Sequence, residues 1–126
     1  MEGPRTNPSR IAVKAEGKIL FIDPAEVAAV EAQGNYVLLL RMSGSAFLLR
    51  QSLSVVADKL LAYGFVRIHR STLVNAAYVE EIYTRTTGEY VLRIQGGKEF
   101  PVSRRFRRDL HAITPLWLGT DGFLPD

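Results

Sequence analysis

The chain has 126 residues and is 47% hydrophobic and 23% charged, which is typical of one globular domain. It contains no cysteine, so disulfide frameworks, thiolate zinc sites and cysteine nucleophiles are excluded. The net charge is +3, and no apolar run approaches the ~20 residues that span a bilayer, so we expect a cytoplasmic protein without a membrane partner.

Short strands with turn signals between them dominate the predicted secondary structure. Residues 1–10 are expected to form a flexible leader. The expected strands span residues 11–15, 18–22, 27–32, 36–42, 45–50, 65–68, 78–84, 89–94 and 98–102. Asp23-Pro24 opens a single helical turn before Val27, and Glu16-Gly17 forms the first tight hairpin.

Two longer helices are expected among these strands. The first spans residues 52–63, with Ser52 as N-cap and Gly64 as its end, and its buried face carries Leu53, Val56, Leu60 and Leu61. The second is capped by Ser103 and runs to Ile113, with Phe106, Leu110 and Ile113 facing inward. The pattern predicts a mainly β domain over residues 11–113, with short helices and small antiparallel sheets. A tail over residues 114–126 is expected to pack back onto it, or else to dock a partner.

The charge is concentrated in the second half of the chain. Residues 67–108 carry nine basic and four acidic side chains, whereas residues 11–66 carry five of each. Twelve of the sixteen basic residues are arginines, whose planar fork suits phosphates and guanine edges. This asymmetry favours a polyanionic partner for the second half.

The sequence offers no pattern for catalysis or metal binding. The only histidines, His69 and His111, do not have a metal-binding spacing, and no phosphate-binding loop or nucleophile elbow is present. Glu80 and Glu81 should point to opposite faces of a strand and so form no acid–base pair. We therefore expect no enzyme, no catalytic residue, no metal and no cofactor.

Three polar segments are not explained by folding alone. The first segment is residues 31–36, the second is residues 65–75, and the third is residues 100–108. In the third, a helix start at Ser103 places Arg104 and Arg105 in the first turn, where the helix dipole disfavours cations unless an anion binds there. Arg107 lies one turn further on, and a helix merely solvated by arginine is the alternative.

The second segment offers further phosphate-binding groups. Arg67 and His69 alternate with apolar residues and should face solvent, and Arg70-Ser71 follows at the end of the strand. His69 is alternatively a structural residue that steadies the turn, and Asn75 is expected to satisfy backbone groups.

These motifs resemble the LytTR DNA-binding domain, the output module of many bacterial response regulators. The resemblance covers Ile11 to Ile113. It rests on R-I-H-R-S-x-x-V-N at Arg67–Asn75, P-V-S-R-R-F at Pro101–Phe106 and E-A-x-G-N-Y at Glu31–Tyr36. It implies a β-rich fold that inserts loops into two successive major grooves and contacts the minor groove between them.

Carried onto this chain, the resemblance implies a sequence-specific, double-stranded DNA-binding transcription regulator of a two-component system. Asn35 or Tyr36 would enter one major groove, Arg104 the other, and Arg70 beside His69 the minor groove. The candidate DNA-binding residues are Asn35, Tyr36, His69, Arg70, Ser71, Arg104, Arg105 and Arg107. The family binds and bends paired repeats, so a homodimer on DNA is expected. Ten preceding residues are too few for a receiver domain, so control by phosphorylation is not expected from this sequence.

Two other functions remain open. A binder of single-stranded nucleic acid or RNA would need exposed aromatic side chains in a row for base stacking. The candidates for such a row are Tyr36, Tyr78, Tyr83 and Tyr90. A protein-interaction module that modulates another regulator would need Trp117 and Phe123 to be exposed.

Overall fold

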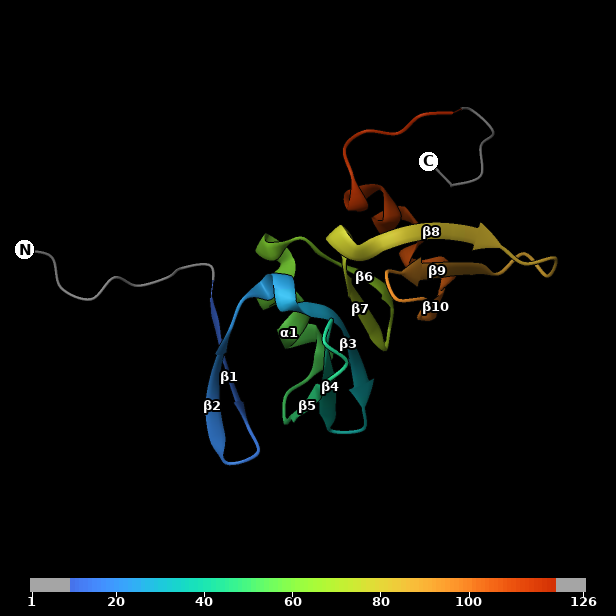
Figure 1. The fold of residues 1–126 in the computed structure, drawn as a ribbon. Helices are drawn as coiled ribbons and strands as arrows, with labels where there is room; N and C mark the ends of the chain where they lie inside the picture. The colour runs from blue at the N-terminus through green and yellow to red at the C-terminus, as the bar shows by residue number, and fades with distance from the viewer. Residues whose placement is uncertain (1–9, 120–126) are drawn as a thin grey trace, which may run out of the picture.

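The computed structural model describes residues 10–119 as a mainly β domain with short helices (Figure 1). Its strands are β1 (Ile11–Ala15), β2 (Lys18–Ile22), β3 (Val27–Gln33), β4 (Tyr36–Arg41), β5 (Ala46–Leu49), β6 (Phe65–His69), β7 (Thr72–Asn75), β8 (Val79–Thr84), β9 (Tyr90–Ile94) and β10 (Glu99–Val102). Its helices are η1 (Pro24–Glu26), α1 (Leu53–Leu60), η2 (Leu61–Tyr63), η3 (Ala76–Tyr78) and η4 (Arg104–Ile113), of which only α1 is α-helical. The predicted fold class is confirmed.

The strands form three antiparallel sheets. A five-stranded sheet has the order β5-β4-β3-β7-β6, a three-stranded sheet has the order β10-β9-β8, and β1 and β2 form a separate hairpin. Beyond the irregular pairing near Ala28, successive residues of β3 and β7 point to opposite faces of the central sheet and join different apolar clusters. Val30 and Leu73 face α1 and the β1–β2 hairpin, whereas Ala29 and Val74 face the three-stranded sheet and η4. The central sheet is therefore the middle layer.

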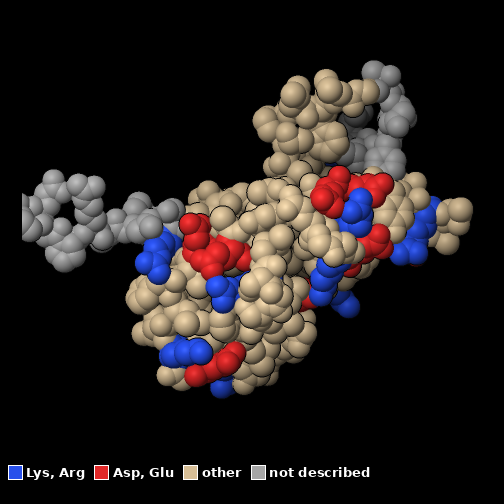
Figure 2. All heavy atoms as spheres, in the orientation of Figure 1, with Lys and Arg blue, Asp and Glu red and all other residues tan. Residues whose placement is uncertain are grey.

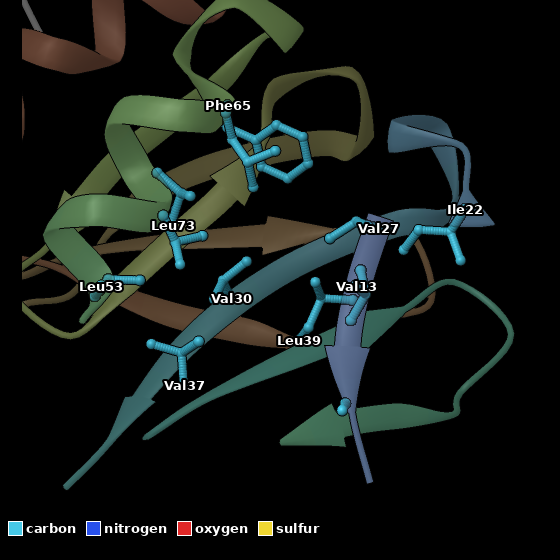
Figure 3. Close-up of a cluster of buried hydrophobic side chains, with 12 residues drawn as sticks. Val13, Ile22, Val27, Val30, Val37, Leu39, Leu53, Phe65 and Leu73 are labelled. Carbon is cyan, nitrogen blue, oxygen red and sulfur yellow. The ribbon is translucent and has the colours of Figure 1, made fainter. Parts of the chain in front are cut away.

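Figure 3 shows the first of these apolar clusters. Val13 from the hairpin lies beside Leu39 of the central sheet, Ile22 lies on the side of Val27, and Leu53 of α1 belongs to the same cluster. Each of these side chains is at most 5% exposed. Burying a side chain of this size contributes about 1.5–3 kcal/mol, so the hairpin and α1 are held by apolar contacts.

Strand β7 (Thr72–Asn75) was not among the expected strands. It pairs with β3 and with β6, and all four of its residues are buried. A strand covered on both faces has no alternation of apolar and polar residues, which is why its sequence T-L-V-N carried no strand signal. Turn chemistry predicted the β1–β2 hairpin correctly, since Glu16 and Gly17 both adopt positive φ angles, of 55° and 77°.

The helix at residues 53–60 is shorter than predicted. Ser52 caps it as expected, because its Oγ accepts a hydrogen bond of 3.2 Å from the Val55 amide. Gly64 adopts a left-handed φ of 84° and ends the helical region as expected. Leu61, however, is 71% exposed, so its assignment to the buried face is wrong. After Leu60 the chain tightens into a 3₁₀ turn, and the extra rotation per residue turns Leu61 outward.

The expected opposite orientation of Glu80 and Glu81 is also wrong. The pairing of β8 with β9 is irregular between Val79 and Glu81, so both carboxylates reach Arg93, at 2.6 and 2.7 Å. In Figure 2, acidic side chains gather over β8 with basic atoms between them. Both carboxylates are ion-paired to the same guanidinium, and this face of the molecule is of mixed charge.

The described part of the tail does not pack back as expected. Leu116 and Leu118 are 70% and 88% exposed, while the Trp117 ring lies 5.1 Å from the His111 ring. Phe123, Leu124 and the leader residues 1–9 lie outside the described residues. No helix within residues 10–119 is long and apolar enough to cross a membrane.

Candidate nucleic-acid interface

Two backbone hydrogen bonds bring the three polar segments together. The Ala32 amide donates to the Ser71 carbonyl at 2.8 Å, which ties the end of β3 to the β6–β7 turn. The Ser103 amide donates to the Ile68 carbonyl at 3.0 Å, which ties the start of η4 to β6. The β6–β7 turn therefore lies between the β3–β4 turn and the start of η4, and Figure 1 shows the two turns on the same side of the molecule.

The β3–β4 turn presents Asn35 and Tyr36 to solvent. Gln33 pairs with Tyr36 across the hairpin, and Gly34 adopts a φ of 61°, which is a conformation that glycine adopts without strain. Both Asn35 and Tyr36 are exposed, Tyr36 by 39%. Since Val37 is fully buried beneath them, the turn is anchored while its tip is open to a partner.

The β6–β7 turn is held by hydrogen bonds between His69 and Ser71. The Ser71 amide donates to His69 Nδ1 at 3.1 Å, and the Ser71 hydroxyl lies 2.8 Å from the same nitrogen. An amide can only donate, so Nδ1 accepts, and the neutral ring carries its proton on Nε2. His69 and Ser71 are half-buried and steady the turn, as the structural alternative for His69 expected. Arg70 is exposed between them, and its side chain makes no hydrogen bond or ion pair among the described residues.

Arg67 does not face solvent freely, contrary to the prediction. Its Nε donates to the His69 carbonyl at 2.9 Å, its Nη2 donates to the Arg70 carbonyl at 2.5 Å, and its guanidinium lies 5.5 Å from the Phe106 ring. Burial lowers the pKa of Arg67, and the positive charge of Arg105 lowers that pKa further. Sequence alternation correctly separated Arg67 from the core but could not reveal its partner on η4.

The start of η4 exposes Arg104 and Arg105, as predicted. Ser103 has the extended φ of −76° and ψ of 153° of an N-cap residue, but its side chain makes no capping bond, so the predicted hydroxyl cap is wrong. The Ser103 amide donates to the Ile68 carbonyl. The helix that follows, η4, is a 3₁₀ helix. The first turn contains no acidic residue. Positive charge therefore accumulates at a helix start, where an anion would be stabilised.

Arg107 is directed toward the three-stranded sheet. Its guanidinium lies 3.8 Å from the centre of the Tyr90 ring, and its Nη2 donates to the Gly88 carbonyl at 3.0 Å. Leu110, which is fully buried, anchors the same side of η4, and Phe106 and Ile113 are partly buried beside it. Both groups that Arg107 contacts belong to the protein itself, which favours a structural role for Arg107.

The tyrosines do not form an exposed row for base stacking. The Tyr78 hydroxyl donates to the Ala25 carbonyl, and the Tyr83 hydroxyl donates to the Glu99 carboxylate at 3.0 Å. Tyr90 is 7% exposed. Tyr36 therefore stands apart from the others, at the β3–β4 turn. Within residues 10–119, no cluster of histidines and carboxylates could hold a metal ion.

Comparison with known proteins assigns the family. A family model described as the LytTr DNA-binding domain matches residues 17–114. The chain is 27% identical over 104 residues to the sensory transduction protein LytT of Bacillus subtilis, covering 82% of this chain and 43% of that protein. It is 30% identical over 103 residues to LytT of Oceanobacillus iheyensis, covering 80% of this chain and 42% of that protein. The chain thus spans less than half the length of these curated relatives.

A solved structure has the same fold. It is the LytTr DNA-binding domain of a Bacillus cereus protein described as a methyl-accepting/DNA response regulator, with a TM-score of 0.71 and 21% identity. The match covers 85% of this chain and 97% of that chain. The match to the family model over residues 17–114 shows that this chain belongs to the LytTR family of DNA-binding domains, which regulate transcription.

Proposed function

We propose that this domain, over residues 11–113, binds double-stranded DNA sequence-specifically through the three adjacent segments. The β3–β4 turn enters one major groove with Asn35 and Tyr36, and the start of η4 enters the next with Arg104 and Arg105. The β6–β7 turn lies over the minor groove between them. The observation that carries the proposal is the pair of backbone hydrogen bonds that joins the turn to β3, through Ser71, and joins β6 next to the turn to the start of η4, through Ile68.

The chemistry of the exposed side chains supports this arrangement. Arg104 has its full guanidinium fork available, since it makes no hydrogen bond or ion pair among the described residues, and guanine O6 and N7 match that fork. Arg70 is exposed at the turn, and narrow minor grooves attract arginine. His69 carries a proton on Nε2, which can donate to a phosphate oxygen or a sugar. Arg107 is bonded to the three-stranded sheet, so we place it outside the contact surface.

We further propose that two copies bind paired repeats and that the domain serves as the output module of a signalling protein. The curated relatives are named sensory transduction proteins and are more than twice as long as the region they share with this chain. One domain with three contact points reads a short site, and a second copy on a neighbouring repeat multiplies the specificity. Sedimentation of the protein with duplexes that carry one or two repeats measures this stoichiometry directly.

The test is a titration of labelled duplex from the gene's own upstream region. Scrambled duplex and single strand serve as controls, each at several salt concentrations. The proposal expects preference for the upstream duplex, with the logarithm of affinity falling against the logarithm of salt at a slope of about −3 to −6, for about four to six phosphates. Equal, weak binding to all three nucleic acids would refute sequence-specific recognition.

A second candidate function is a docking surface in the tail. Trp117 is 43% exposed, and Leu116 and Leu118 on either side of it are more exposed still. Exposed apolar groups of this kind are typical of protein contacts. If the titration showed no preference among nucleic acids, a role in modulating another regulator would become the leading function.

A further inference from the structure

Arg67 connects two elements of the proposed interface through one side chain. Along the edge of its guanidinium, Nε and Nη2 donate to the carbonyls of His69 and Arg70, at 2.9 and 2.5 Å. Both carbonyls belong to the β6–β7 turn, where the pairing of the two strands is irregular between Arg67 and His69. The side chain therefore supplies hydrogen bonds that the strand ladder does not provide there.

The same guanidinium also contacts η4. It lies 5.5 Å from the centre of the Phe106 ring, and the Arg105 guanidinium lies at the same distance from that ring. A planar cation next to an aromatic ring is attracted by the electrons of the ring. Phe106 follows directly after Arg104 and Arg105, so Arg67 joins the turn that carries Arg70 to the turn that carries Arg104.

We propose that Arg67 is a positioning residue, which holds the β6–β7 turn and the start of η4 at the spacing required to bind DNA. This inference rests on the proposed function. Arg67 is half-buried and donates hydrogen bonds to the protein's own carbonyls, whereas Arg70 and Arg104 are exposed and their side chains make no such bond among the described residues. Its contribution to DNA binding is therefore made through Arg70, Arg104 and Arg105.

The nature of the side chain matters for this role. Lysine keeps the positive charge but has a single ammonium group, so it cannot bond two successive carbonyls along one edge and stack on Phe106 at the same time. A simple phosphate contact, in contrast, requires little more than the charge. Arg67→Lys therefore separates a positioning residue from a direct phosphate contact.

The experiment measures the affinity of Arg67→Lys and Arg67→Gln for the preferred duplex and for scrambled duplex. We expect both variants to bind the preferred duplex about tenfold more weakly than the unmodified protein, and scrambled duplex within about threefold, since phosphate contacts are retained. Arg108→Lys is the matched control, because Arg108 is an exposed arginine on η4, and it should bind both duplexes as the unmodified protein does.

Two outcomes would overturn the inference while leaving the proposed function intact. If Arg67→Lys bound like the unmodified protein and Arg67→Gln lost about one unit of salt slope, Arg67 would be a phosphate contact. If both bound normally, Arg67 would not contribute. If the unmodified protein itself showed no preference among duplexes, the proposed function would have failed instead.

A measurement on the DNA-free protein tests the linkage itself, and it also guards against a variant that fails to fold. In ¹⁵N NMR spectra the Arg67 Nε–H should exchange slowly with water, because it is bonded to the His69 carbonyl. Arg67→Lys should shift the amide signals of both Ser71 and Phe106 while leaving α1 unchanged. Fast exchange of Nε–H, or shifts confined to the β6–β7 turn, would refute the connection between the two elements.

Discussion

Asn75 should act in stability and not in DNA contact, although it belongs to the motif that carries the family resemblance. It is 5% exposed, and its Nδ2 donates to the Val27 carbonyl at 2.9 Å and to the Pro24 carbonyl at 3.4 Å. Its Oδ1 accepts from the Ala77 amide at 3.1 Å. One side chain thus ties the end of β7 to η1 and to the start of β3. This agrees with the expectation from the sequence that Asn75 satisfies backbone groups.

The loss of unfolding free energy expected for Asn75→Ala follows from the burial of these hydrogen-bond partners. Val27 is fully buried, so its carbonyl loses a partner that water cannot replace, which costs about 1–3 kcal/mol. The Ala77 amide belongs to an exposed residue and can bond water, so its loss adds about 0.5–1 kcal/mol. The free energy of unfolding should fall by about 1.5–4 kcal/mol, which lowers Tm by about 10 °C for a domain of this size.

Urea unfolding followed by far-ultraviolet circular dichroism measures this change. Asn35→Ala is the matched control, because Asn35 is an exposed asparagine at the β3–β4 turn and its replacement should change stability by less than about 0.5 kcal/mol. At low temperature, folded Asn75→Ala should bind DNA normally, whereas Asn35→Ala should bind more weakly. A normal unfolding free energy for Asn75→Ala combined with weaker DNA binding would refute the structural role.

Four further predictions concern single side chains. Arg104→Ala should cost about 1–3 kcal/mol on the preferred duplex and relax selectivity at one base pair, as binding to a panel of single-base variants would show. Arg107→Ala should lower the unfolding free energy by about 1–2 kcal/mol, since it removes the contact with Tyr90, and should leave the affinity of the folded protein for DNA unchanged. Hydrogen bonding by the Asp23 amide, and then by Arg41, lowers the pKa of Glu26 from its ordinary value of 4.5. The stabilisation by Glu26 should therefore be complete above pH 4.5 and disappear as the pH falls through the lower folded-state pKa, and Glu26→Gln should reduce the pH dependence of Tm in that range. Trp117, the single tryptophan, should be quenched efficiently by acrylamide because it is 43% exposed.

Each of these predictions has a contradicting result. Arg104 would be a phosphate contact if its replacement weakened all sequences equally, and Arg107 would belong to the DNA surface if its replacement weakened binding without loss of stability. An unchanged acid response in Glu26→Gln would show that its ionised form gives no stabilisation. Poor quenching of Trp117 would show that the tail packs on the domain after all.

Local patterns were sufficient to predict most strands and to single out the three polar segments that we propose as the DNA interface. Alternation, tight turns and charge depend on neighbouring residues, so the β1–β2 hairpin, the turn at Asn35 and the exposed Arg104 could all be identified along the chain. Strand β7 could not be identified in this way, because burial on both faces removes the alternation of apolar and polar residues that marks a strand. The contact of both Glu80 and Glu81 with Arg93 could not be predicted from the sequence either, because it depends on the irregular pairing of β8 with β9.

The sequence by itself determined that Arg70 lies in a turn and that Arg104 lies at a helix start, since turns and helix starts are local features. Only the tertiary structure decided which arginines contact other parts of the protein and which remain exposed. Arg104 is left open to a partner, Arg67 binds the turn beside it, and Arg107 stacks on Tyr90 of another sheet. Arg67 contacts Phe106 of η4, and Arg107 contacts Tyr90 of β9. These contacts between different elements form only when the chain folds, so residue type alone does not show which arginines remain exposed.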